Sequence, residues 1–150
     1  MQTRFLFFLI AGIIFLGALF IFTNLKADND IFPKILKVKT GDIYITVLET
    51  KADREKGLSG VKSLPENEAV FFVFDGAEKY GIWMKDMHFP IDIIWLDEAY
   101  RIVHVEENIS PETFPRVFIP PQKSMYIIEA NSSFVDKNEI KVGNVLNFVP

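Results

Sequence analysis

The alternation of apolar and polar residues along the chain predicts a series of short strands. Residues 36–39 and 43–47 alternate in the manner of half-buried strands. Residues 69–74, AVFFVF, are apolar on both faces, so we expect a central strand that is covered on both sides. Further short strands, separated by turn residues in the spacing typical of an all-β domain, are expected in GIWMKDM, IDIIWLD, RIVHVEEN, 124–130 and 145–149.

Two capping patterns predict two short helices. Residues 50–53 have the spacing of a capping box, and Gly57 can end that helix in the left-handed conformation. Residues 133–136 repeat the capping spacing for a second helix that ends near Asn138. With only these two helices, the strands predict a mainly β domain, either a β-sandwich or a closed barrel. The proline-rich residues 108–123 are expected to form a long loop, which is either functional or disordered.

The N-terminus is a hydrophobic segment rather than part of this domain. Residues 5–22 contain no charge, and as a helix they would span roughly 27 Å, close to the hydrocarbon thickness of a bilayer. Arg4 supplies a positive flank that stays in the cytoplasm. We therefore expect a transmembrane or signal segment at 1–27, a linker at 28–34 and a β domain outside the cytoplasm at 35–150. The long apolar run favours an uncleaved anchor over a secreted or periplasmic form after signal cleavage.

Composition narrows the classes of function. The first 27 residues hold two basic residues and no acid, so the rest of the chain holds 14 basic and 20 acidic residues. Such an acidic domain is not expected to bind nucleic acid, which requires a basic face. The chain has no cysteine, which excludes disulfides, thiolate nucleophiles and cysteine-ligated zinc. No P-loop, dinucleotide-binding or nucleophile-elbow pattern is present, and no cofactor is expected.

The densest group of chemically capable side chains lies in residues 83–92, WMKDMHFPID. On a strand, Trp83 and Lys85 share one face and could form a platform for a flat or sugar-like ligand; alternatively, Trp83 is a core aromatic along which Lys85 extends. Asp92 lies among apolar residues and needs a partner, for which Arg54 and Lys85 are candidates. Asp92 is then either a structural ion-pair member or a functional carboxylate with a shifted pKa. We expect these four side chains to converge.

Metal and acid–base chemistry have weaker support. Residues 86–92 and the His-x-Glu at residues 104–106 contain spacings that a metal could use, but no specific motif such as HExxH is present, and no metal site is expected. An acid–base hydrolase or lyase would use Asp86, Asp92 or Glu129. No oriented base is evident beside these acids, so an enzyme is the less favoured interpretation.

A set of short motifs follows in order between about residues 37 and 149: Arg54-Glu55-Lys56-Gly57-Leu58, Ser63-Leu64-Pro65, Phe72-Val73-Phe74, Trp83-Met84-Lys85-Asp86, Pro90-Ile91-Asp92-Ile93 and Ile140-Lys141-Val142-Gly143. Together they resemble the domain-of-unknown-function family 192, whose members are small and often exported. The chain departs from the family's pattern at Ser59, where Met is usual, at Asp86, where Asn is usual, and at Asn144, where Asp is usual. The resemblance implies a β-sandwich-like fold and no established activity.

Three functions therefore remain open. The favoured one is an extracytoplasmic binding module, tethered to the membrane through residues 5–22, that holds a small molecule, a glycan or an envelope protein. Its candidate contact residues are Arg54, Trp83, Lys85, Asp86, Asp92 and Glu129. The alternatives are an envelope scaffold without a small-molecule site and an acid–base hydrolase or lyase. A cavity lined by Trp83 and Lys85 would favour the binding module.

Overall fold

The structure is a computed structural model that describes residues 34–150. The expected hydrophobic segment and nearly all of the expected linker lie outside the described residues. Among residues 34–150, no helix is both long enough and apolar enough to cross a membrane.

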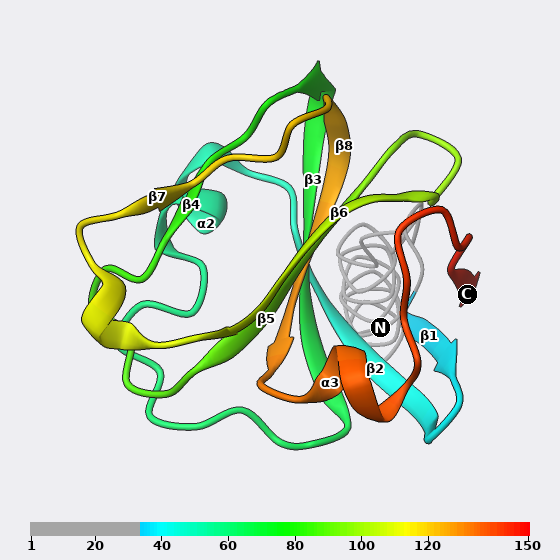
Figure 1. Cartoon of the computed structure of the whole chain (residues 1–150), viewed down its shortest axis with the longest axis horizontal. Helices are drawn as coiled ribbons and strands as arrows, with labels where there is room; N and C mark the ends of the chain where they lie inside the picture. The colour runs from blue at the N-terminus through cyan, green and yellow to red at the C-terminus, as the bar shows by residue number, and fades with distance from the viewer. Residues whose placement is uncertain (1–33) are drawn as a thin grey trace, which may run out of the picture. The chain divides into compact units, whose positions relative to one another are not determined.

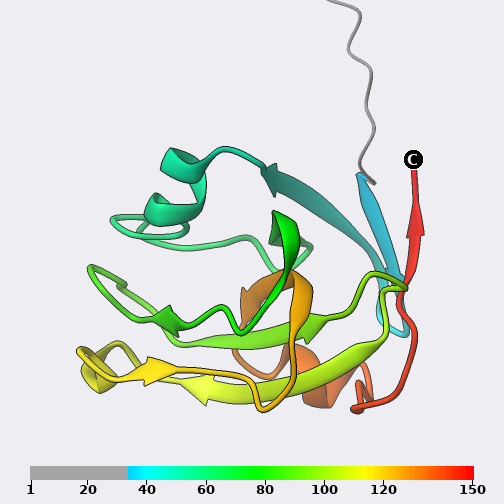
Figure 2. The same ribbon diagram turned by 90° about the horizontal axis from the view of Figure 1, so that it is seen from above.

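The domain is built on a curled, seven-stranded sheet that forms a half-barrel (Figures 1 and 2). Its strands are, in spatial order, β6 (Ile102–Ile109), β5 (Ile91–Leu96), β8 (Ser124–Asn131), β3 (Glu68–Glu78), β2 (Gly41–Leu48), β1 (Ile35–Val38) and β9 (Asn147–Val149). Neighbouring strands are antiparallel except for the parallel pair β2 and β3. The expectation of a mainly β fold is confirmed, in the form of one curled sheet.

The remaining elements are short. A second, two-stranded sheet pairs β4 (Ile82–Trp83) with β7 (Val117–Phe118). The two expected helices are present as α2 (Lys51–Lys56) and α3 (Phe134–Lys137), and a 3₁₀-helix, η1, spans Pro111–Thr113. The long loop expected at 108–123 therefore contains a 3₁₀ turn and a strand. In Figure 1, α2, β4 and β7 lie on one side of the central strands, and α3 lies on the other.

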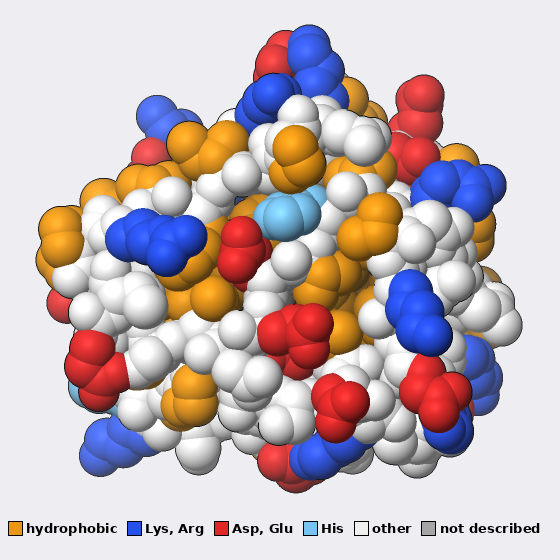
Figure 3. Space-filling view, viewed as in Figure 1, with side chains coloured by type: hydrophobic (Ala, Val, Ile, Leu, Met, Phe, Trp, Pro, Cys, Tyr) orange, Lys and Arg blue, Asp and Glu red, His pale blue; other side chains and the backbone are white. Residues whose placement is uncertain are grey.

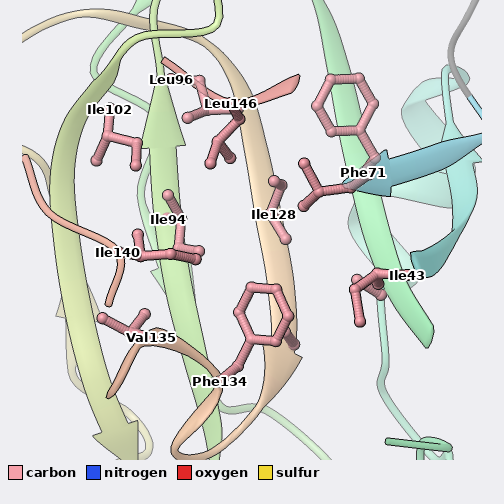
Figure 4. Close-up of a cluster of buried hydrophobic side chains, with 13 residues drawn as sticks. Ile43, Phe71, Ile94, Leu96, Ile102, Ile128, Phe134, Val135, Ile140 and Leu146 are labelled. Carbon is pink, nitrogen blue, oxygen red and sulfur yellow. The ribbon is translucent and has the colours of Figure 1, made fainter. Parts of the chain in front are cut away.

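The central strands are buried on both faces, and each face has its own hydrophobic core. In β3, Phe71 packs into the first core, whereas Val70 and Phe72 pack into the second. The first core includes Phe134 of α3 and Ile128 of β8 (Figure 4). The second core lies on the side of α2 and the two-stranded sheet. The apolar run at 69–74 is thus the covered central strand that its pattern predicts.

Helix α2 begins and ends at the residues that its sequence predicts, although Gly57, with ψ of −129°, does not take the expected left-handed helical conformation. The Thr50 hydroxyl accepts a hydrogen bond from the Asp53 amide at 3.1 Å, which satisfies one of the free N–H groups of the first turn. Gly57 ends the helix with φ of +49°, a conformation that a residue with a Cβ adopts at a cost. The helix is therefore fixed at both ends, although it buries none of its own residues.

Helix α3 is capped differently from the prediction. Ser133 stands at the N-cap, but its side chain makes no capping hydrogen bond. Instead, the Val135 amide donates to the carboxylate of Asp92, which reaches the helix from β5 at 2.9 Å. The local sequence does not predict this cap, because its acceptor, Asp92, lies 43 residues before Val135 in the chain.

Candidate functional site

A cavity of about 760 Å³ lies between α2 and the β4 segment on the side of the second core. It is lined by α2 with residues 57–59, by β3 around Phe72 and Phe74, by residues 80–83 and 85–87, and by Glu129 of β8. Separate parts of the chain thus meet at one site. Of the six candidate contact residues, the structure brings five to this cavity, namely Arg54, Trp83, Lys85, Asp86 and Glu129.

The inner part of the cavity is formed by Phe72 and Glu129 beside the backbone of Gly57. A Cβ at position 57 would stand 3.3 Å from Cζ of Phe72 and 3.8 Å from Oε2 of Glu129. Glycine is favoured here by its positive φ, and a Cβ would also press on the edge of the Phe72 ring. The end of α2 can lie against the sheet because residue 57 has no side chain.

Glu129 is a buried carboxyl without a partner. Its side chain lies on the face of β8 that carries the second core, and its strand neighbours in register are Val70 and Ile93. Only 5% of the residue is exposed, and within residues 34–150 its carboxyl accepts no hydrogen bond and joins no ion pair. Burial raises the pKa of the Glu129 carboxyl from 4.5 to about 8, because the apolar surroundings disfavour the charged form.

The two walls of the cavity are tied together by backbone carbonyls. The Ser59 hydroxyl donates to the carbonyl of Lys85 at 2.8 Å, and the Gly60 amide donates to the carbonyl of Asp86 at 2.8 Å. Asp86 has a φ of +56°, a conformation in which Asp and Asn are several-fold enriched. The positive φ is compatible with both Asp86 and the Asn that is usual at this position in the family that the sequence resembles.

Arg54 anchors α2 to the sheet. Its guanidinium donates from Nη1 to the carbonyls of Glu49 and Val73, the latter at 2.7 Å, and it lies 5.0 Å from the ring centroid of Phe74. Such carbonyl bonds and a ring contact hold a guanidinium in one orientation. Arg54 is therefore at the site, as expected, but its Nη1 group is engaged with the protein itself.

Aromatic side chains form much of the wall. Phe74 stacks on Tyr80 with ring centroids 3.6 Å apart and nearly parallel planes. Trp83 is 49% exposed, and the Lys85 ammonium lies 5.7 Å from its ring centroid. Trp83 is therefore not a core aromatic, and Met84 is the core residue of this segment.

Asp92 lies away from this cavity, and the expected pairing with Arg54 or Lys85 is wrong. It is fully buried on the other face of the sheet, where Oδ1 accepts from the Asn108 amide at 2.7 Å and Oδ2 from the Val135 amide at 2.9 Å. Two N–H donors satisfy a carboxylate without a cation. Asp92 thus joins β6 and α3 to β5.

Metal coordination is not supported by any cluster in the part of the chain that the structure describes. Residues 34–150 hold no group of three or more His, Asp and Glu side chains that could surround an ion. His104 and Glu106, whose spacing is compatible with a metal, instead contact one another at 3.1 Å.

Surface charge does not form a single-sign field on the face seen in Figure 3. Acidic and basic side chains are interspersed there with apolar ones. The cavity lining is mixed too, with both basic and acidic residues. Selectivity at the site must therefore come from individual groups rather than from net charge.

Comparisons with known proteins place the chain within a family without assigning an activity. The model of DUF192, described as "Uncharacterized ACR", matches residues 34–148. A UPF0127 protein from Thermococcus kodakarensis is 28% identical over 116 residues, which cover 76% of this chain and 66% of that protein, just under two thirds of its length.

Two crystal structures share the fold at 20% sequence identity and a TM-score of 0.69. One is a protein from Sinorhizobium meliloti 1021 described as a candidate transcription regulator, with 76% of this chain and 90% of that one covered. The other is a protein of unknown function from Novosphingobium aromaticivorans, with 77% and 84% covered. At this identity the likeness establishes the fold alone.

Proposed function

We propose that this chain, which belongs to the DUF192 family of uncharacterised proteins, binds a small molecule in the cavity above Glu129. The cavity volume of about 760 Å³ falls in the range of roughly 300–1,000 Å³ that is usual for small-molecule sites. The wall supplies aromatic surface, and the inner end supplies a single buried polar group. These features favour a ligand with an apolar or aromatic body and one polar end.

The observation that carries the proposal is the unpartnered carboxyl of Glu129. Burying a polar group without a hydrogen bond costs about 1–3 kcal/mol in proteins, and buried polar groups almost always have a partner. The other buried acid of the described domain, Asp92, accepts two backbone hydrogen bonds, whereas the carboxyl oxygens of Glu129 reach only the cavity. A bound molecule would supply the partner that Glu129 lacks.

A titration with a simple probe tests this proposal. Benzyl alcohol, added to ¹⁵N-labelled protein, should shift the amide resonances of residues 54–59, 72–75, 80–87 and 129. Met87→Trp enlarges a half-buried side chain of the lining and should weaken binding, whereas Val145→Trp adds the same ring at an exposed position outside the cavity. Shifts that are scattered over the domain, or that are unchanged in Met87→Trp, would contradict a site in the cavity.

The proposal includes a location outside the cytoplasm, with the chain tethered through residues 5–22. Its support is the uncharged apolar run and the preceding Arg4. Protease added to cells with a permeabilised outer layer should digest the domain, and protection of the domain there would refute export. A mature N-terminus at Asp28 would show cleavage and refute the anchor.

A second candidate function is acid–base catalysis, and the raised pKa of Glu129 favours it. A carboxyl that stays protonated at neutral pH can act as a general acid, and Asp86 lines the same cavity. A hydrolase of this kind should turn over a p-nitrophenyl glycoside or ester. Its activity should fall as pH rises through about 8, and Glu129→Gln should abolish it. Absence of turnover across a panel of such substrates would leave binding as the function.

A further inference from the structure

We infer that the cavity selects an organic cation, an ammonium group on an apolar or aromatic body, and that the carboxyl of Glu129 receives its positive charge. This inference rests on the proposed function, since it names the class of ligand for the same site. Three observations support it. Glu129 lacks the hydrogen-bond donors that Asp92 has, aromatic side chains line the cavity, and the basic side chains of the lining contact groups other than Glu129.

The partner that Glu129 lacks must come from the ligand side of the cavity. Its strand neighbours Val70 and Ile93 offer no side-chain donor, and Phe72 and the backbone of Gly57 lie near Oε2, so the carboxyl is open only toward the cavity. A carboxyl in that position can be satisfied by a hydrogen-bond donor, and a cation stabilises its ionised form whether or not the cation also donates a hydrogen bond. An anionic group in the same place would instead meet a second acid.

Aromatic faces strengthen the preference for a cation. Phe72, Tyr80 and Trp83 line the cavity, whereas the ring of Phe74 is already covered by Tyr80 and by the Arg54 guanidinium. The faces of aromatic rings attract cations, and rings around an ammonium are a recurrent means of binding it. The same aromatic surface would also contact the apolar part of the ligand.

The basic side chains of the lining do not neutralise Glu129. Nη1 of Arg54 is bound to backbone carbonyls, Lys51 lies 3.7 Å from Glu55, and Lys85 lies over Trp83. The full set of ionisable groups that share the cavity with Glu129 is Lys51, Arg54, Glu55 and Lys56 from α2, Asp75 from β3, and Tyr80, Lys85 and Asp86 from the β4 segment. Strands β5 and β8 present apolar neighbours to it, Ile93 and Ile127.

Binding of a cation should be coupled to loss of a proton. In the empty cavity the carboxyl holds its proton up to a pH of about 8, and the arriving cation favours the ionised form, so the proton leaves to solvent as the ion pair forms. The apparent affinity for a permanently charged cation should therefore rise about tenfold per pH unit below 8 and level off above it. A neutral ligand of similar size should show no such dependence.

Three probes test the inference on the full-length protein in detergent. Benzyltrimethylammonium carries a charge that does not titrate, benzyl alcohol is neutral, and benzenesulfonate is an anion. In calorimetric titrations at pH 6, 7 and 9, the affinity for the cation should increase about a hundredfold from pH 6 to pH 9, and the affinity for benzyl alcohol should not change with pH. Glu129→Gln should remove the pH dependence of the cation, whereas Glu107→Gln, at an exposed position of β6, should leave it intact.

The outcomes separate this inference from the proposed function. If benzyl alcohol binds and the cation shows no pH-dependent gain, or if benzenesulfonate binds more tightly than the cation, the cavity is a ligand site but the assignment to cations is wrong. If none of the three probes binds, both the inference and the proposed function fail. A pH-dependent gain that persists in Glu129→Gln would also overturn the role of this carboxyl.

Discussion

Replacing Glu129 by glutamine removes the ionisable group from the inner end of the cavity while nearly preserving its shape. The pKa of about 8 means that the folded protein keeps this carboxyl protonated at pH values where the unfolded chain, with a pKa of 4.5, has released the proton. Between these values the native state binds the additional proton. Stability should therefore fall as pH rises from 4.5 toward 8 and change no further, through this group, at higher pH.

The size of the effect follows from the two pKa values. Each unit of pKa difference corresponds to about 1.4 kcal/mol, so the wild-type protein should lose about 3 to 4 kcal/mol relative to Glu129→Gln between pH 5 and pH 8. At pH 5 the two proteins should have nearly equal free energies of unfolding, because a protonated carboxyl and a carboxamide are both neutral. At pH 8 the glutamine variant should be the more stable protein.

Urea denaturation at pH 5, 6, 7 and 8 measures this difference. The comparison of wild type with Glu129→Gln cancels the titration of all other groups, and Glu107→Gln controls for the loss of a glutamate at an exposed position. A difference between wild type and Glu129→Gln that stays constant with pH would refute the reasoning. In that case, the carboxyl of Glu129 would be hydrated or paired in the native state.

Three other substitutions test the structural assignments by thermal denaturation. Phe72→Ala should lower the free energy of unfolding by about 3–5 kcal/mol because the side chain is 2% exposed, and a nearly unchanged melting temperature would contradict the central strand. Asp92→Asn should lower the free energy of unfolding by about 1–3 kcal/mol, because the NH₂ group of asparagine replaces one of the two oxygens that accept the backbone N–H groups of Asn108 and Val135. An unchanged stability would contradict a role for Asp92 in joining these segments. Lys85→Ala should alter stability by less than about 0.5 kcal/mol because its ammonium is exposed, and unfolding would identify it as structural instead.

Much of the fold can be predicted from local sequence pattern. The double-faced apolar run at 69–74 identifies the central strand, and the spacing from Thr50 to Gly57 gives α2 together with both of its ends. These features can be predicted because they depend on residues that are close together in the sequence. The curl of the sheet and the parallel pairing of β2 with β3 depend on contacts between distant segments, so the pattern does not reveal them.

The sequence predicts the candidate site in part, because it does not separate Glu129 from Asp92. Trp83, Lys85 and Arg54 do meet at one cavity, whereas Asp92, which the sequence allows as either a structural ion-pair member or a functional carboxylate, lies on the other face of the sheet. Glu129 has the same signal, since it interrupts an apolar strand between Ile128 and Ala130. Both acids are buried, but backbone N–H groups distant in sequence donate to Asp92 and not to Glu129. Because those donors come close only when the chain folds, the sequence does not reveal the difference.

A direct titration of the Glu129 side chain tests the central claim, that an unpaired buried carboxyl awaits a ligand in this cavity. The carboxyl carbon of selectively ¹³C-labelled glutamate, assigned with Glu129→Gln, reports its ionisation by NMR. We predict a pKa of about 8 in the free protein and a clearly lower value when benzyltrimethylammonium is present at saturation. A pKa near 4.5 in the free protein, or one that benzyltrimethylammonium does not change, would contradict the account.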